Sequence, residues 1–361
     1  MRILVFNPMG SILRYQLIDM PEAKVLAAGA CYRIGHSHSC LKYVKTGYSP
    51  VILEKDIYYY DTAISEIIKV LTDRETGVVQ DISMIDMIAC RAVYAGENFG
   101  NAVLMDDNSF GEIKEYIEND LFNRESDLVL IEEVRRLLPS ASVTAVFDMS
   151  YQGERLNYIT ITDKTYKDLY ADRNEESTYG TTHKWAVRRT ADLTGKPYRQ
   201  SKLVSCCLGA QPSIFASDNG KQVLIPDKSY VFDRYMTGNH ITNKNQNLFV
   251  CPKVDGAYSV NSRFSGNINK HIGILTALMD GIDAIVFTGN DDEKAAGIRY
   301  DILRNMEYLG VNIDWQENRP SNNERILNRP DSRVKVLVIP ANDELAIAKE
   351  AYILKQPVSM L

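Results

Sequence analysis

Acidic residues follow several apolar stretches of the chain, in positions where carboxylates could hold a metal ion. Asp148 follows the apolar, β-branched run 143–147, Asp291 and Asp292 follow run 284–288, and Asp343 follows run 334–339. Ligands of open α/β sheets gather at the carboxyl ends of strands. Mg²⁺ takes few protein oxygens and keeps waters and phosphates as its other ligands. The pattern favours Mg²⁺-dependent phosphate chemistry, although Asp148 alone could equally be a turn residue that caps the next segment.

Two other polar groups could do chemistry. The turn between strands 2–7 and 12–20 carries Asn7 and Ser11, and such a hairpin tip can hold a phosphate or be only a turn. His36, His38 and Cys40 alternate as metal ligands can, but no downstream residue completes a set, so a polar loop is the preferred interpretation. The six cysteines are scattered and are interpreted as reduced, small apolar residues.

Strands that alternate with helices must position these groups. Apolar stretches predict strands at 2–7, 12–20, 143–148, 203–209, 214–217, 284–288 and 334–339, and helical periodicity predicts helices at 61–74, 110–119, 128–138, 268–279, 300–309 and 345–354. Residues 238–264 are rich in Asn, Ser and Gly and predict a loop. Asn342 or Asp343 is the expected N-cap of the last helix.

The strand–turn–strand unit at 2–20 has a counterpart at 203–221, which predicts an internal duplication. A chain of 361 residues is too long for one compact core, and a polar tract begins after residue 150, where we expect the domain change. The predicted domains are 1–150, completed by helix 345–361, and 151–344.

Composition excludes several classes of protein. The net charge is −6 and no run of Lys or Arg forms a nucleic-acid footprint. No apolar run approaches the length of a membrane helix, and the first residues lack the features of a signal peptide. We therefore expect a cytoplasmic protein without a nucleic-acid or membrane partner.

Collinear motifs resemble the acetate kinase family over nearly the whole chain. The segments that carry the resemblance are RILVFNPMGSILRYQLIDM (2–20), CRAVYAGENF (90–99), AVFDMSY (145–151), YGTTHKW (179–185), CCLGAQPSI (206–214), DAIVFTGNDDE (283–293) and VKVLVIPANDELAIA (334–348). The resemblance implies two ribonuclease-H-like domains of the actin-like ATPase superfamily with a cleft between them, and a homodimer. It also implies transfer of the γ-phosphoryl group of ATP to a short carboxylate, with Mg²⁺ as cofactor and ATP and ADP as nucleotides.

The matched positions imply roles for individual residues. Arg91 and Asp148 match catalytic residues; Asn7, Asp148 and Asp343 match positions near the metal. Val93 and Leu121 match positions that line the acyl pocket. The nucleotide loops match at Gly209, Gly289 and Asn290.

Several catalytic positions depart from the family pattern. Tyr179 stands where the family has His, and His240 stands where it has Arg. A tyrosine carries no positive charge at neutral pH, and a histidine is mostly neutral there, whereas arginine is always charged. Pro212 removes an N–H from one phosphate loop, and Asp291 with Asp292 adds negative charge to another. Two hypotheses follow: an acetate-kinase-type phosphotransferase, weak or altered in its substrates, or an impaired relative that works as a binding or assembly module.

Overall fold

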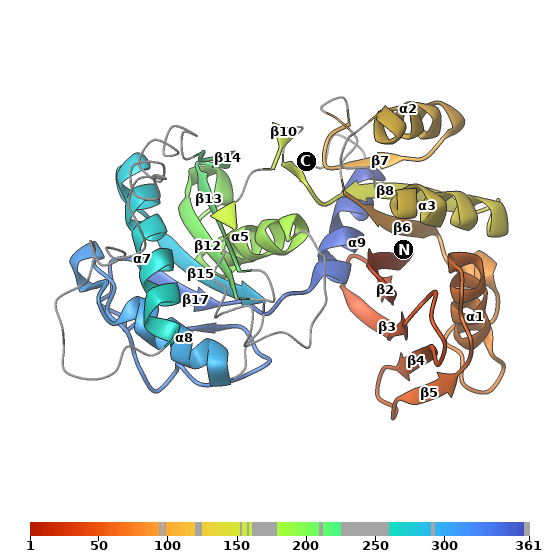
Figure 1. The fold of residues 1–361 in the computed structure, drawn as a ribbon, viewed down its shortest axis with the longest axis horizontal. Helices are drawn as coiled ribbons and strands as arrows, with labels where there is room; N and C mark the ends of the chain where they lie inside the picture. The colour runs from red at the N-terminus through yellow and green to blue at the C-terminus, as the bar shows by residue number, and fades with distance from the viewer. Residues whose placement is uncertain are drawn as a thin grey trace, which may run out of the picture. The chain divides into compact units, whose positions relative to one another are not determined.

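The computed structural model contains two compact α/β units, shown in Figure 1 with the chain coloured from its N-terminus to its C-terminus. It describes residues 1–93, 96, 99–119, 125–151, 154–156, 159–160, 179–208, 212–224, 260–289 and 293–356. The first unit comprises residues 1–156, 173–185 and 341–361, and the second comprises residues 157–172 and 186–340. The boundary at 185/186 lies within one helix, α5 (Gly180–Thr194).

The first unit is built on an eight-stranded sheet in the order β5-β4-β3-β2-β1-β6-β8-β7. β1, β6 and β8 are mutually parallel neighbours, and the other pairings are antiparallel. The strands are β1 (Arg2–Met9), β2 (Ile12–Asp19), β3 (Lys24–Tyr32), β4 (Cys40–Lys45), β5 (Val51–Glu54), β6 (Met87–Ala92), β7 (Ala102–Leu104) and β8 (Ser142–Phe147). The helices are α1 (Tyr60–Thr72), η1 (Ile82–Met84), α2 (Asp107–Asn119), α3 (Glu125–Leu137) and α9 (Asp343–Leu354), and a small ribbon joins β9 (Ser150–Tyr151) to β10 (Glu154–Arg155).

Both faces of the central strand β1 are buried, and its successive residues point to opposite sides of the sheet. In β1, Leu4 and Phe6 join the core cluster that includes residues of α1 and α3. Ile3 and Val5 join a second cluster with Ile347 and the neighbouring apolar residues of α9. The C-terminal helix α9 therefore packs on β1, β2, β6, β7 and β8, although it begins 196 residues after Phe147, the end of the nearest of them in sequence (Figure 1).

The second unit repeats the central part of this topology. Its sheet has the order β11-β13-β12-β15-β17-β16, with β14 paired to β13, and β12 is antiparallel to β13 and parallel to β15, which is parallel to β17. The strands are β11 (Ile159–Thr160), β12 (Lys202–Leu208), β13 (Ser213–Asp218), β14 (Lys221–Gln222), β15 (Ala284–Gly289), β16 (Arg325–Ile326) and β17 (Lys335–Val338); the helices are η2 (Tyr198–Gln200), α7 (Val260–Leu278), α8 (Glu293–Leu303) and η3 (Glu307–Leu309). The pattern β13-β12-β15-β17 matches β2-β1-β6-β8, so the predicted duplicated α/β fold of the actin-like ATPase type is confirmed.

The helices predicted at 268–279 and 300–309 differ most from the structure. α7 begins at Val260, inside the segment expected to be a loop, because Phe264 and Ile268 anchor its first turns in the core. The helix expected at 300–309 is instead α8, which ends at Leu303, followed by the short η3. No helix among the described residues is long and apolar enough to cross a membrane.

Candidate active site in the first unit

The three parallel strands of the first unit bring three predicted site residues to one edge of the sheet. Asn7 lies near the end of β1, Arg91 near the end of β6, and Asp148 directly follows β8. The register aligns these ends, since Phe6 pairs with Cys90 and Arg91 pairs with Val146. Parallel neighbours therefore carry all three residues to the carboxyl edge, where α/β sheets bind ligands.

Arg91 and Asp148 form a buried ion pair. Nη2 of Arg91 lies 3.1 Å from Oδ2 of Asp148, and the side chains are 5% and 0% exposed. Nη1 of Arg91 also donates to the carbonyl oxygen of Pro8, at 3.0 Å. The guanidinium therefore links the ends of β1, β6 and β8 and is held in one orientation.

The N-terminus of α5 also donates hydrogen bonds to the carboxylate of Asp148. The backbone N–H of Thr181 donates to Oδ1 of Asp148 at 2.6 Å, and that of Gly180 donates to Oδ2 at 3.3 Å. The positive end of a helix stabilises a carboxylate in this place. A Cβ at position 180 would collide with the carbonyl oxygen of Asp148, so only glycine permits the close approach.

The first turn of α9 contributes a second acidic group. Asn342 is the N-cap, with its Oδ1 accepting the N–H of Leu345 at 3.2 Å. Asp343 follows, and its Oδ1 accepts a hydrogen bond from Oγ1 of Thr182 on α5, at 2.8 Å. Burial, followed by the charge of Glu344, raises the pKa of Asp343 to about 6.

Two buried polar atoms of the site lack a partner among the described residues. Asn7 donates from Nδ2 to Oε1 of Glu344 at 2.9 Å, but its Oδ1 has no hydrogen-bond partner there. The same holds for Oγ1 of Thr181. A buried polar group without a partner costs about 1–3 kcal/mol, so both atoms are suited to a bound ligand or ion.

His183 and Lys184 are buried residues of α5 that directly follow Thr182. Burial lowers the pKa of His183 to about 3, so its imidazole is neutral at physiological pH. Nζ of Lys184 donates to the carbonyl oxygens of Phe147 and Ser150, at 2.6 and 3.0 Å. Lys184 thus fixes the turn that carries Asp148.

Sequence reasoning did not single out Thr181, Thr182 or Lys184 as individual site residues. The segment YGTTHKW contained them, and their clustering beside matched residues was the available signal.

The remaining predicted residues are distributed over both units. Tyr179 is half-buried and precedes α5, and its carbonyl oxygen accepts the N–H of His183. Val93 is half-buried after β6 and accepts the N–H of Met149. Gly289 ends β15 in the second unit with a φ of 86°, a conformation that favours glycine. The predicted residues outside the described part of the chain are Leu121, Gly209, His240, Asn290, Asp291 and Asp292.

The residues at the carboxyl edge suit Mg²⁺ as a partly hydrated ion. In the described ranges, no three His, Cys, Asp or Glu side chains gather into a metal-binding group. His36 and His38 are exposed, and Cys40 is half-buried at the start of β4. Mg²⁺ is usually held by one or two carboxylates with waters and phosphates, and Asp343 with the unpartnered Oδ1 of Asn7 fits that donor set.

The raised pKa of Asp343 predicts a pH-dependent gain from Asp343→Asn in metal-free protein. The folded state holds the proton up to about pH 6 and the unfolded state only to about pH 4, so the wild type loses stability across that window. Asparagine has no such loss, and its oxygen can still accept from Thr182. We expect the stability difference in favour of Asn to grow by about 1.5 kcal/mol between pH 5 and pH 7.5.

Urea unfolding of both proteins in EDTA measures this difference. The titration of His183 affects both proteins alike and therefore cancels in the comparison. A difference that stays constant with pH would show that Asp343 has an ordinary pKa.

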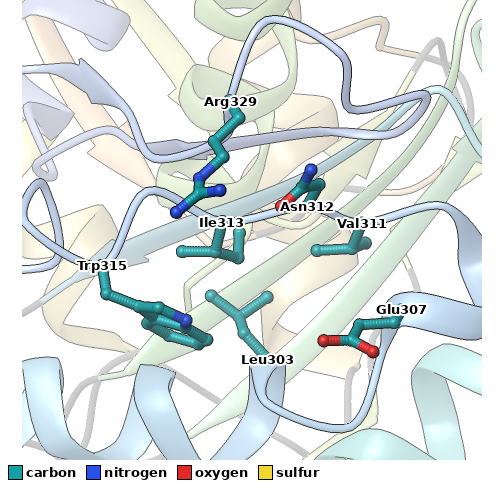
Figure 2. Close-up of a pocket in the computed structure, with 7 residues that line it drawn as sticks. All are labelled: Leu303, Glu307, Val311, Asn312, Ile313, Trp315 and Arg329. Carbon is teal, nitrogen blue, oxygen red and sulfur yellow. The ribbon is translucent and has the colours of Figure 1, made fainter.

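The second unit contains a pocket, and none of the predicted site residues lines it (Figure 2). In Figure 2, Arg329 and Glu307 lie on opposite sides of the apolar residues Leu303, Val311 and Ile313. Its lining consists of Leu303, Glu307, Val311, Asn312, Ile313, Trp315 and Arg329.

Comparison with known proteins identifies the family that the chain matches. The profile of the Acetokinase family matches residues 2–226 and 252–349. An acetate kinase of Acetivibrio thermocellus is 33% identical over an alignment of 392 positions, gaps included, which covers 97% of this chain and 98% of the relative. An acetate kinase of Caldanaerobacter subterraneus is 32% identical over 394 positions, covering 97% and 98%.

Solved structures show the same fold. The acetate kinase of Porphyromonas gingivalis superposes with a TM-score of 0.75 at 24% identity, covering 98% of this chain and all of that one. A propionate kinase from Francisella tularensis superposes with a TM-score of 0.71 at 22% identity, covering 97% and 98%.

Proposed function

The chain belongs to the Acetokinase family, and we propose that it transfers the γ-phosphoryl group of ATP to a short-chain carboxylate to give an acyl phosphate. The observation that carries the proposal is the buried Arg91–Asp148 pair, held on the N-terminus of α5 beside Asp343 and Asn7. Phosphoryl transfer depends mainly on positioning and on neutralising charge around the transferred group. A fixed guanidinium beside a metal site provides both.

In the proposed reaction, a carboxylate oxygen attacks the γ-phosphorus of ATP. An O–P bond to the acceptor forms as the bond to the ADP oxygen breaks, and the ionised acceptor needs no general base. Arg91 supplies positive charge to the transferred group or the acceptor, and Asp148 holds its guanidinium in place. Val93 and Leu121, which match acyl-pocket positions of the family, would line the acyl group of the acceptor.

Mg²⁺ would be held by Asp343 and Oδ1 of Asn7, with Asp148 adding negative charge close by. When bound, the ion neutralises charge on the phosphate oxygens and orients them. Tyr179 and His240 would contact the transferred group in place of the family's more strongly charged residues. Gly209, Gly289 and Asn290 would lie against the nucleotide. The homodimer stays a prediction.

A binding or assembly module is the second candidate. Pro212, Tyr179 and His240 are the observations that favour it, because each removes a donor or a charge that phosphate binding uses. In this case the fold and the ion pair would serve stability and a protein partner.

Calorimetry with Mg²⁺-ATP and Mg²⁺-ADP separates the two candidates. The kinase binds both nucleotides with dissociation constants below about 1 mM, an affinity equivalent to about 4 kcal/mol. Omission of Mg²⁺ with EDTA present should weaken the binding of both. Absence of heat at millimolar nucleotide would reject the kinase and favour the assembly module.

A further inference from the structure

The amide of Asn7 has a defined polarity. Its Nδ2 lies 2.9 Å from Oε1 of Glu344, and both side chains are buried. A carboxylate offers only acceptor atoms, so the amide must present its nitrogen to Glu344. Its oxygen then necessarily faces the other way.

The oxygen of this amide can accept a hydrogen bond or bind a cation. Oδ1 of Asn7 is buried and has no hydrogen-bond partner in the part of the chain that the structure describes. Glu344 comes directly after Asp343 in the first turn of α9. The two acidic residues therefore have separate contacts: Asp343 accepts from Thr182, and Glu344 accepts from Asn7.

We propose that Glu344 is a positioning residue for the metal: it holds the amide of Asn7 so that Oδ1 is directed to Mg²⁺. This inference rests on the Mg²⁺ site of the proposed function and assigns Glu344 no direct contact with the ion. Partners of metal ligands commonly change metal affinity 10- to 100-fold when they are replaced.

The test is a double-mutant cycle on Mn²⁺ binding, followed by electron paramagnetic resonance of the free ion. Glu344→Gln keeps the side-chain size, but glutamine can either donate to Asn7 or accept from it, so the polarity of Asn7 is no longer enforced. We expect this variant to bind Mn²⁺ about ten-fold more weakly than the wild type. Asn7→Ala should weaken binding about as much, because the oxygen ligand is lost.

The double variant decides how Glu344 acts. If Glu344 works through Asn7, Glu344→Gln has no further effect once Asn7 is alanine, and the double variant binds like Asn7→Ala. Additive losses would overturn the proposal and show that Glu344 acts as an independent charge or as a direct ligand. An unchanged affinity in Glu344→Gln would overturn it as well.

Glu350→Gln is the matched control. Glu350 lies on the same helix, is buried to the same degree, and loses the same charge. We expect its Mn²⁺ affinity to stay within about two-fold of the wild type, and thermal unfolding to confirm that all variants are folded. If the wild type itself bound no Mn²⁺, the metal site of the proposed function would fail; a normal wild type with additive variants would refute only the role of Glu344.

Discussion

Replacement of Asp148 by Asn is expected to lower the rate of acyl-phosphate formation by about a thousand-fold or more, because Arg91 loses the group that orients it. The same change should cost about 3–5 kcal/mol of stability, since it leaves the Arg91 guanidinium buried without its counter-ion. Hydroxamate trapping measures the activity, and urea unfolding measures the stability.

Two comparisons separate the structural role of Asp148 from its chemical role. Adding Arg91→Met to Asp148→Asn removes the stranded charge, so the double variant should recover stability without recovering activity. Glu133→Gln breaks the exposed pair with Arg136 and should cost less than about 1 kcal/mol. An Asp148→Asn protein with near-normal stability and more than a tenth of the activity would contradict the account of this pair.

Restoring family charge at two positions is expected to raise activity. The combination of Tyr179→His and His240→Arg should increase acyl-phosphate formation about ten-fold or more, the effect of one recovered donor in the transition state. Tyr179 is well placed for this, because it directly precedes the turn of α5 that holds Asp148. The measurement is the same hydroxamate assay under saturating Mg²⁺-ATP.

The control for this gain is Tyr59→His, which changes the same residue types at a position that is 72% exposed. It should leave activity unchanged. If the restored double variant also showed no gain, the missing charge would not be what limits the reaction. The altered loops at Pro212 and Asp291 would then be the explanation for the low activity.

The convergence of the site could be predicted from sequence because it follows from topology. Asn7, Arg91 and Asp148 each lie near or just after the end of an apolar strand, and parallel neighbours must place such residues at one edge. The duplication was also visible, since residues 2–20 and 203–221 follow the same strand–turn–strand pattern.

Other contacts could not be predicted, because they depend on how helices are oriented on the sheet. Asp343 and Glu344 are adjacent acids, and only the orientation of α9 decides that Glu344 contacts Asn7, 337 residues away. Similarly, the need for glycine at position 180 arises from the approach of Asp148.

Local composition gave wrong predictions for the start of α7 and for β5. The first turns of α7 are rich in Asn, Ser and Gly, and burial of Phe264 overrides their weak helix propensity. The edge strand β5 was missed because all four of its residues are exposed, so no alternation of apolar and polar residues marks it.

The central claim is that this chain makes an acyl phosphate, and hydroxamate trapping of the product from ATP with acetate, propionate or butyrate tests it most directly. We predict hydroxamate that requires both ATP and Mg²⁺ and that disappears in Asp148→Asn, with at least one of the three acids as acceptor. No hydroxamate from any of them, in the wild type and in the variant with restored charge, would contradict the kinase and leave the assembly module.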